Sequence, residues 1–281
     1  MFGKANLELT KNPWLMRRGR DLVELGFRLS RLPGLRWVHP WTRPEGTDMR
    51  WLPINDDLLL PQGVPAPSSL LDRWIEEASH RVILDYCGCR RASACRHYPV
   101  EIGCLLMGDA APQAARSISR EVEPEEARAH ANRAVRAGLV PAVGTARVDN
   151  LVFNMEDPQR MLTVCFCCEC CCLGRYLRHV PLDSLDRIFP PLPGVSVRVN
   201  DRCTGCGECL SHCYIGAIEV VGGRAVHGRY CRACGRCAAA CPRGAVEVRI
   251  DDPDFLEKTY RSMRSRADHT GMLCRAPQSL E

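Results

Sequence analysis

Residues 203–213 read CTGCGECLSHC, and residues 231–242 read CRACGRCAAACP. Both stretches carry four cysteines with the spacing C-x2-C-x2-C-x3-C. This doubled run is typical of chains that hold two [4Fe–4S] clusters, in which the fourth cysteine of each run binds the cluster of the other run. The sequence therefore predicts one cluster on Cys203, Cys206, Cys209 and Cys241, and a second cluster on Cys231, Cys234, Cys237 and Cys213.

The geometry of an iron–sulfur cubane explains this spacing. Three thiolates on a tight loop can face three corners of one cubane, and the fourth cysteine begins the helix that leads to the neighbouring cluster. Gly205, Gly207 and Gly235 let the backbone pass close to the inorganic sulfides, where N–H groups stabilise negative charge. Zinc fits this doubled order poorly, because zinc sites favour paired knuckles. One departure is Tyr214, which stands where the second run has a proline and leaves the ligation intact.

Short apolar strands are expected around the two runs. Residues 217–221 and 245–249 follow the runs, and the pseudo-symmetry of the repeat would pair them with residues 195–199 and 224–226. We therefore expect a two-cluster ferredoxin-like βαβ-repeat module at residues 195–250.

Ten further cysteines lie upstream of this module. Four of them have the spacing C-x-C-x5-C-x8-C, and six form the stretch CFCCECCC. Thiolates this crowded repel one another unless iron or another soft metal neutralises them. The sequence therefore predicts an additional iron–sulfur site or sites among Cys87, Cys89, Cys95, Cys104, Cys165, Cys167, Cys168, Cys170, Cys171 and Cys172.

Several arrangements of these ten cysteines remain open. The first four are enough for a third [4Fe–4S] cluster. The other six complete a fourth cluster, share ligands with the first four, or present a free thiolate or an open iron site. Simple burial of apolar cysteines accounts for one or two of the ten, and the isolated Cys274 is expected to have no ligand role.

Composition favours metal ligation over disulfides. Cysteine makes up 19 of the 281 residues, and hydrophobic residues make up 46%. A core of this size does not need many disulfides, and the N-terminus has no apolar segment of the secretory type. We therefore expect a cytoplasmic protein. Since no run of 18 apolar residues occurs, no transmembrane segment is expected.

Four regions can be separated, and together they predict an α+β fold. The first, 1–67, holds a basic helix and an extended arm. The second, 68–194, is a cysteine-rich α/β domain with helices at 68–79 and 124–137, a strand at 81–86, and a hairpin of strands at 139–143 and 150–154. The ferredoxin module at 195–250 and a C-terminal tail at 251–281 follow.

The basic helix is expected at residues 14–32. Leucines fall on one face and arginines on the other, and residues 1–50 carry the whole net charge of +5. One interpretation is an ordinary helix that packs its leucines on the core of the protein. The other is peripheral membrane contact or partner docking through this helix.

Residues 52–248 resemble an uncharacterised family of archaeal and bacterial 4Fe–4S binding proteins. The matching stretches are LPIN at 52–55, residues 70–83, CGCR with YPVEIGCLLMG, EARAHANRAVRAGLV, CFCCECCC, PGVSV and the two ferredoxin runs. The resemblance covers roughly 70% of the chain and implies a ferredoxin module fused to a cysteine-rich N-terminal domain. It brings no established reaction, and residues 1–50 fall outside it.

The function that these patterns favour is low-potential electron transfer. Two ferredoxin clusters would relay electrons between an external redox partner protein and the N-terminal cysteine site. Six module arginines surround the motifs and either steer that partner or are simply solvated: Arg202, Arg224, Arg229, Arg232, Arg236 and Arg243. The first alternative is an oxidoreductase whose N-terminal metal site is catalytic. Its acid–base candidates are His80, Asp85, His97, Tyr98, Glu101, Asp109, Glu169 and His179, and none is assigned a catalytic role.

A lesser alternative is a redox-sensing regulator with a winged helix around residues 124–154. The helix at 124–137 lacks a basic face, so nucleic-acid binding is not expected. The sequence has no glycine-rich phosphate loop, which leaves flavin, nicotinamide and nucleotide chemistry without support.

Overall fold

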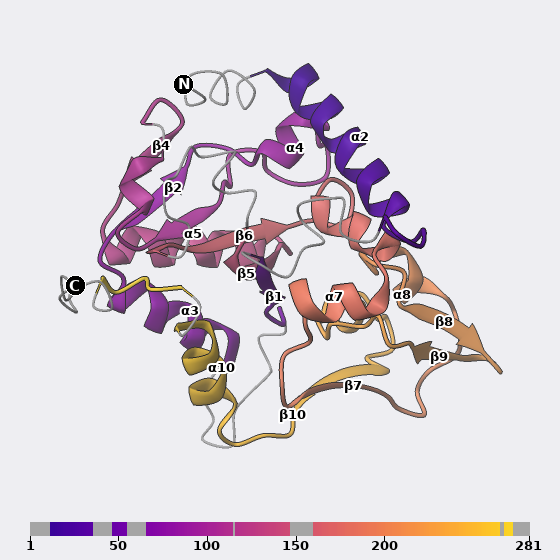
Figure 1. The fold of residues 1–281 in the computed structure, drawn as a ribbon. Helices are drawn as coiled ribbons and strands as arrows, with labels where there is room; N and C mark the ends of the chain where they lie inside the picture. The colour runs from indigo at the N-terminus through magenta and orange to yellow at the C-terminus, as the bar shows by residue number, and fades with distance from the viewer. Residues whose placement is uncertain are drawn as a thin grey trace.

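A six-stranded antiparallel sheet forms the centre of the molecule in this computed structural model, which describes residues 12–35, 47–54, 66–114, 116–146, 160–264 and 267–271. Its strand order is β1-β5-β6-β3-β2-β4 (Figure 1). The strands are β1 (Asp48–Trp51), β2 (Arg81–Leu84), β3 (Leu105–Met107), β4 (Ser119–Glu121), β5 (Val140–Thr145) and β6 (Leu162–Cys167).

Alternation along β6 sorts its side chains onto the two faces of this sheet. Leu162, Val164 and Phe166 join a core that includes Trp74. Cys165 and Cys167 point to the opposite face, where the second core lies. The strand therefore carries cysteines on one face only, while the other face holds the hydrophobic core.

Helices cover both faces of the sheet. The first core lies under α3 (Ala66–Glu77), α5 (Pro124–Arg136) and α10 (Phe255–Arg264), and α3 packs against both of the others. The second core lies under α2 (Pro13–Leu29), the 3-10 helix η4 (Leu173–His179) and α7 (Leu182–Ile188). Shorter pieces complete this part: α4 (Gly88–Ala92) and the 3-10 turn η2 (Ala111–Gln113).

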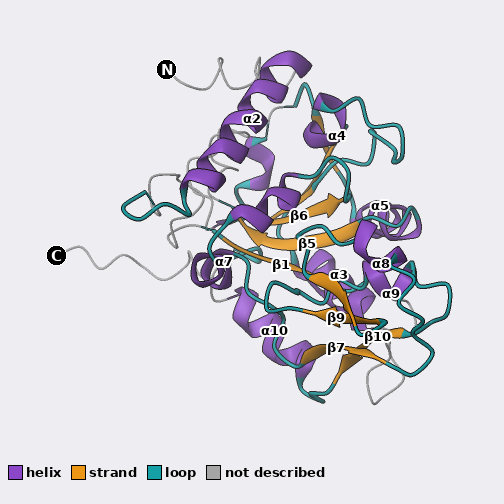
Figure 2. Ribbon diagram, turned by 90° about the vertical axis from the view of Figure 1, so that its right-hand side faces the viewer, coloured by secondary structure: helices purple, strands orange, loops and turns teal. Residues whose placement is uncertain are grey.

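The C-terminal part consists of two small sheets and two short helices (Figure 2). The strand β7 (Val195–Val199) pairs with β10 (Val246–Ile250), and β8 (Ile218–Val221) pairs with β9 (Arg224–His227). The helices α8 (Glu208–Ser211) and α9 (Arg236–Ala239) lie against each other. All four strands expected from the sequence are present.

The α+β class is confirmed, but the α/β description of the N-terminal domain is wrong. Every strand pair in the described residues is antiparallel, and no parallel βαβ unit occurs among them. The helix expected at 124–137 is present as α5. It starts at Pro124 with Glu125 and Glu126 in its first turn, which suits the helix dipole. The hairpin strand expected at 150–154 lies outside the described residues.

The expected amphipathic helix is present as α2, but its leucine face points to solvent and another face contacts the core. Its leucine face is exposed: Leu22 and Leu25 are 68% and 51% accessible to solvent, and Trp14 is 61% accessible. The inward face carries Phe27, which is 2% accessible, and Arg20, which is 8% accessible. The interpretation in which the leucines pack on the core is therefore wrong. Among the described residues, no helix combines the length and apolar character needed to cross a bilayer.

Gly144 sets the close approach of β1 to β5. It faces Met49 in the strand register, has a φ of +152°, and a Cβ added there would overlap the carbonyl oxygen of Asp48. We expect Gly144→Ala to lower the free energy of unfolding by about 3 kcal/mol or more, measured by chemical denaturation. Gly19→Ala is the matched control. Gly19 lies in α2 with nothing within 4 Å of an added Cβ, so that change should be neutral or stabilising by about 0.5–1 kcal/mol. Equal effects of the two substitutions would contradict this account.

Candidate metal centres

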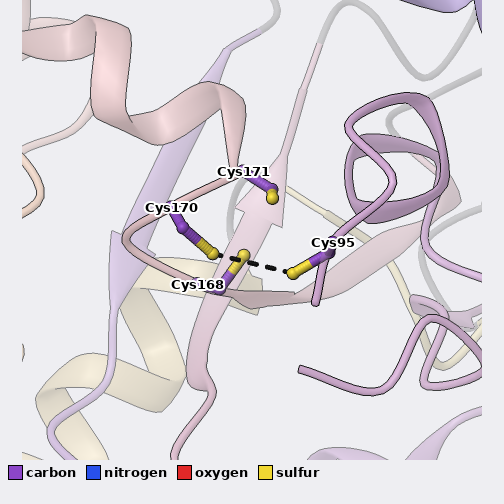
Figure 3. Close-up of side chains that lie close together, drawn as sticks. All are labelled: Cys95, Cys168, Cys170 and Cys171. Atoms are coloured by element: carbon purple, nitrogen blue, oxygen red, sulfur yellow. Dashed lines mark hydrogen bonds between the residues drawn. The ribbon is translucent and has the colours of Figure 1, made fainter. Parts of the chain in front are cut away.

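Four upstream cysteines form one compact group. The Sγ atoms of Cys95, Cys168, Cys170 and Cys171 all lie within 4.8 Å of one another, and the Sγ atoms of Cys95 and Cys170 are 3.7 Å apart. Figure 3 shows Cys168, Cys170 and Cys171 on the loop that follows β6, facing Cys95 from another segment. We call these residues the four-cysteine group. Within the described ranges, it is the only set of three or more potential metal ligands packed this closely.

The size of the four-cysteine group bears on the metal that it could hold. A tetrahedral Zn–S distance of about 2.3 Å places the sulfur atoms of a zinc site about 3.8 Å apart. The spacing therefore suits a single tetrahedral ion as it stands, and a larger cubane would require the sulfurs to spread.

Protonation of the metal-free group is uneven. Burial raises the pKa of Cys168 to about 12, and burial also raises the pKa values of Cys170 and Cys171. At Cys95, burial is outweighed by the backbone N–H groups of His97 and Tyr98, and the pKa is lowered. Because metal binding displaces protons from such thiols, we expect metal affinity of the group to rise with pH.

The other upstream cysteines form close pairs, and we call Cys87, Cys89, Cys167 and Cys172 the second set. The Cys172 thiol donates a hydrogen bond to the Sγ atom of Cys167 over 3.1 Å, and Cys87 and Cys89 are hydrogen-bonded to each other. That bond lowers the pKa of Cys87 to about 6 and raises the pKa of Cys89. Cys104 and Cys165 form a separate pair at 3.4 Å. The ten upstream cysteines thus divide into the four-cysteine group and three close pairs.

An apolar cavity adjoins the second set. Its walls include Cys89, Cys165, Cys167 and Cys172 together with Trp51 and Phe189. The remaining walls offer few polar groups.

Arg90 links the two upstream sets. Its side chain has no solvent exposure, and it donates hydrogen bonds to the carbonyl oxygens of Pro99 and Phe166 over 2.8 and 2.7 Å, and to that of Ile102. Burial opposes the charge of Arg90, but Cys87, Cys168 and Cys104 outweigh it, so the pKa of the guanidinium is raised. The three carbonyl oxygens and the Cys87 thiol, whose pKa is lowered, offset the cost of burying this cation.

The structure brings the two C-terminal sets together as the sequence grouped them. Cys203, Cys206, Cys209 and Cys241 line one cavity of about 340 Å³. Cys213, Cys231, Cys234 and Cys237 line another of about 360 Å³. In each cavity, the fourth cysteine comes from the other run. The ligation itself stays a prediction.

The loops that carry these cysteines repeat each other in conformation. Gly207 and Gly235 have φ values of 80° and 81°, and each precedes the short helix that holds Cys209 or Cys237. After each run, a backbone N–H donates to a cysteine sulfur over 3.2 Å, from Ala217 to Cys213 and from Ala245 to Cys241. Such bonds stabilise negative charge on sulfur.

Trp51 and Tyr214 connect the C-terminal part to the upstream cysteines. Tyr214 donates a hydrogen bond from its hydroxyl to the carbonyl oxygen of Cys167 over 3.0 Å, and its ring centroid is 5.1 Å from that of Trp51. Trp51 borders both the Cys213 cavity and the apolar cavity. The sequence analysis missed both roles, although the replacement of proline by Tyr214 was a visible signal.

Two module arginines point inward rather than toward a partner. Arg232 is 3% accessible and pairs with Asp186 at 2.7 Å. Arg236 donates to the hydroxyl of Tyr98 over 2.6 Å and pairs with Glu169 at 2.9 Å. These side chains join the C-terminal part to the upstream domain, so steering of a partner by them is not favoured.

The remaining acid–base candidates are scattered. His80 contacts Glu121 on the surface, Asp109 pairs with Arg160, and His179 lies 3.8 Å from Glu24. His97 is exposed near the four-cysteine group. No pair of them forms an arrangement that indicates catalysis within the described residues.

Comparison of the chain with protein-family models, curated proteins and solved structures gives no match. The chain is a cysteine-rich protein whose four-cysteine group could hold a metal. Its function must be argued from the geometry above.

Arg90 should prove essential to the upstream sites. Arg90→Met leaves three buried carbonyl oxygens without a donor, each at a cost of about 1–3 kcal/mol. We expect the midpoint of thermal unfolding to fall by about 10 °C and bound metal to be lost from the upstream sites. Arg91→Met is the matched control, because Arg91 belongs to the same helix but stacks on Tyr86. Unchanged stability and metal content in Arg90→Met would refute this role.

Proposed function

We propose that this chain is an iron–sulfur electron-transfer protein. Two ferredoxin [4Fe–4S] clusters, on the Cys203 and Cys231 runs, relay electrons to or from a further cysteine-ligated iron–sulfur site in the N-terminal domain. The observation that carries the proposal is the pair of cavities, each lined by three cysteines of one run and the last cysteine of the other. This is the ligand pattern of two-cluster ferredoxin runs.

The contacts between the two parts of the molecule support a relay. Cys213 lines the second C-terminal cavity, and the next residue, Tyr214, bonds to the backbone of Cys167. Cys167 in turn contacts Cys172, which is separated by one peptide bond from Cys171 of the four-cysteine group. A continuous path of short steps therefore runs from the C-terminal cavities to the four-cysteine group.

The density of upstream thiols favours iron over a purely structural ion. Cysteines from separate segments meet in two sets around the cationic Arg90. Iron–sulfur clusters with four thiolates carry the negative charge that such a site requires. A structural zinc ion in the four-cysteine group is the second candidate, because the sulfur spacing suits it.

Metal analysis tests the relay. We expect anaerobically purified protein to hold about twelve to sixteen irons per chain, with equal sulfide. Cys170→Ser and Cys172→Ser should each remove iron from one upstream set and change the EPR spectrum after dithionite reduction. Cys274→Ser, which alters an isolated cysteine, is the control and should change neither. A content of about eight irons, unaffected by Cys170→Ser and Cys172→Ser, would refute the upstream clusters.

We further propose that α2 contacts the surface of an anionic membrane. Its outward face presents Trp14, Leu22, Leu25 and Leu29, and Leu32 is exposed just beyond its end. Arg18 lies over the ring of Trp14, and the exposed Arg28, paired with Glu24, lies along the same helix; both side chains complement anionic headgroups. An apolar stripe beside arginines is the pattern of helices that lie in the membrane interface, with the arginines reaching headgroups.

Vesicle sedimentation tests this contact. We expect the full chain to bind vesicles of phosphatidylcholine with phosphatidylglycerol more strongly than phosphatidylcholine alone. Leu25→Glu combined with Leu29→Glu should reduce binding at least tenfold, since both side chains are exposed and their loss leaves the fold intact. The control pair is Val221→Glu with Val226→Glu, which replaces exposed apolar residues elsewhere. Equal binding by both pairs would contradict the proposal.

A further inference from the structure

The four-cysteine group borders a large polar cleft. Cys95, Cys170 and Cys171 form part of its wall, and α2 contributes Arg17, Arg20 and Asp21. Ser93 and Tyr176 also line it. The metal candidate with the tightest sulfur spacing is therefore next to an open space rather than sealed in the core.

Positive charge dominates this cleft. Four arginines line it, from three separate segments: Arg17 and Arg20 on α2, Arg96 after α4, and Arg175 in η4. Asp21 is the one acidic residue in its described lining. The formal charge of these five side chains is +3, four positive charges less one negative. Such a concave, basic site raises the local concentration of anions.

Two of these guanidinium groups have a buried N–H without a partner. Arg20 is 8% accessible, and its terminal nitrogens already bond to the carbonyl oxygen of Cys89, the hydroxyl of Ser93 and the hydroxyl of Tyr176. Its Nε atom has no hydrogen-bond partner, and neither has the Nε atom of Arg175. An unsatisfied donor on a buried charged group is costly, and an oxyanion in the cleft would accept these bonds.

We propose that this cleft binds a small oxyanion, such as a molecule with carboxylate or sulfate-like groups, next to the four-cysteine group. A small ligand fits better than the acidic surface of a protein. Arg20 is only 8% accessible, whereas a flat partner would meet mainly the exposed Arg96 and His97. Guanidinium groups bind carboxylates and similar anions by paired, charge-assisted hydrogen bonds.

The anion site extends the proposed electron relay, and its biological role rests on that relay. If electrons reach the four-cysteine group, the anion in the cleft is the molecule closest to them, which makes the cleft the substrate side of the relay. Binding itself needs only the arginines and the shape of the cleft. The two proposals can therefore fail separately.

Isothermal titration calorimetry of the full, anaerobically purified chain tests the site. The probes are sodium sulfate and sodium succinate at low ionic strength, and succinamide serves as the uncharged counterpart of succinate. We expect saturable binding of both anions at one site, competition between them, and no binding of succinamide. Arg175→Gln and Arg96→Gln should each weaken succinate binding about tenfold or more, the loss typical of a charge-assisted hydrogen bond.

Arg91→Gln is the matched control. Arg91 is close in sequence to Arg96 but stacks on Tyr86 outside the described lining of the cleft, so this change should leave succinate binding unaltered. Absence of saturable binding of both anions, or equal weakening by Arg91→Gln, overturns the proposal. Binding of polyglutamate without binding of either small anion also overturns it, in favour of an acidic protein partner.

Iron content measured on the same samples separates the two proposals. An iron-poor chain that binds succinate would remove the relay and support the anion site. An iron-replete chain that binds neither probe would support the relay and overturn the anion site.

Discussion

The buried guanidinium of Arg90 is the interaction on which the upstream half of the molecule depends. It joins the loop at Pro99 and Ile102 to the strand β6 at Phe166, with no access to water. A cation in this position needs negative charge nearby, and the closest titratable groups that favour it are thiols. Thiolates gathered at this density need a cation in turn. A metal bound by these cysteines would therefore be coupled to the fold, because each would supply the charge that the other requires.

The same requirement explains why other arginines turn inward. Arg20 points from α2 toward Cys89 and Tyr176, and Arg236 reaches from the C-terminal part to Glu169 within the cysteine stretch. These side chains place positive charge around the cysteines and at the same time tie separate segments together. The orientation of α2 fits this arrangement: Arg20 points inward to the cysteines, while the leucines are left outside together with Arg17, Arg18 and Arg28. The inward contacts of Arg20 and Phe27 thus replace the burial of leucine side chains that amphipathicity alone would predict.

Local patterns predicted the local features, and tertiary contacts decided the rest. The spacing of the two runs predicts that Cys241 joins the Cys203 run and Cys213 the Cys231 run, and each set lines one cavity. Their binding of clusters stays a prediction. Capping residues and hydrophobic periodicity were enough to predict the positions of the helices α5 and α2. The division of the ten upstream cysteines was not predictable, since Cys95 meets Cys170 only through the pairing of distant segments. The prediction that the leucine face of α2 packs on the core was wrong for the same reason. Periodicity defines two faces of a helix but does not say which of them the protein covers.

The stretch CFCCECCC begins in β6 and supplies cysteines to both faces of the sheet. Cys165 and Cys167 face one side of the sheet, because alternate side chains of a strand point the same way. Cys168, the first residue after β6, belongs to the core on the other side. A continuous stretch of chain therefore supplies cysteines to sites on both faces of the sheet. Two sites joined in this way are separated by a few covalent bonds rather than by the thickness of a core. That proximity suits the transfer of an electron better than the independent binding of two structural ions, and it accounts for a crowding of cysteines that stability alone would not require.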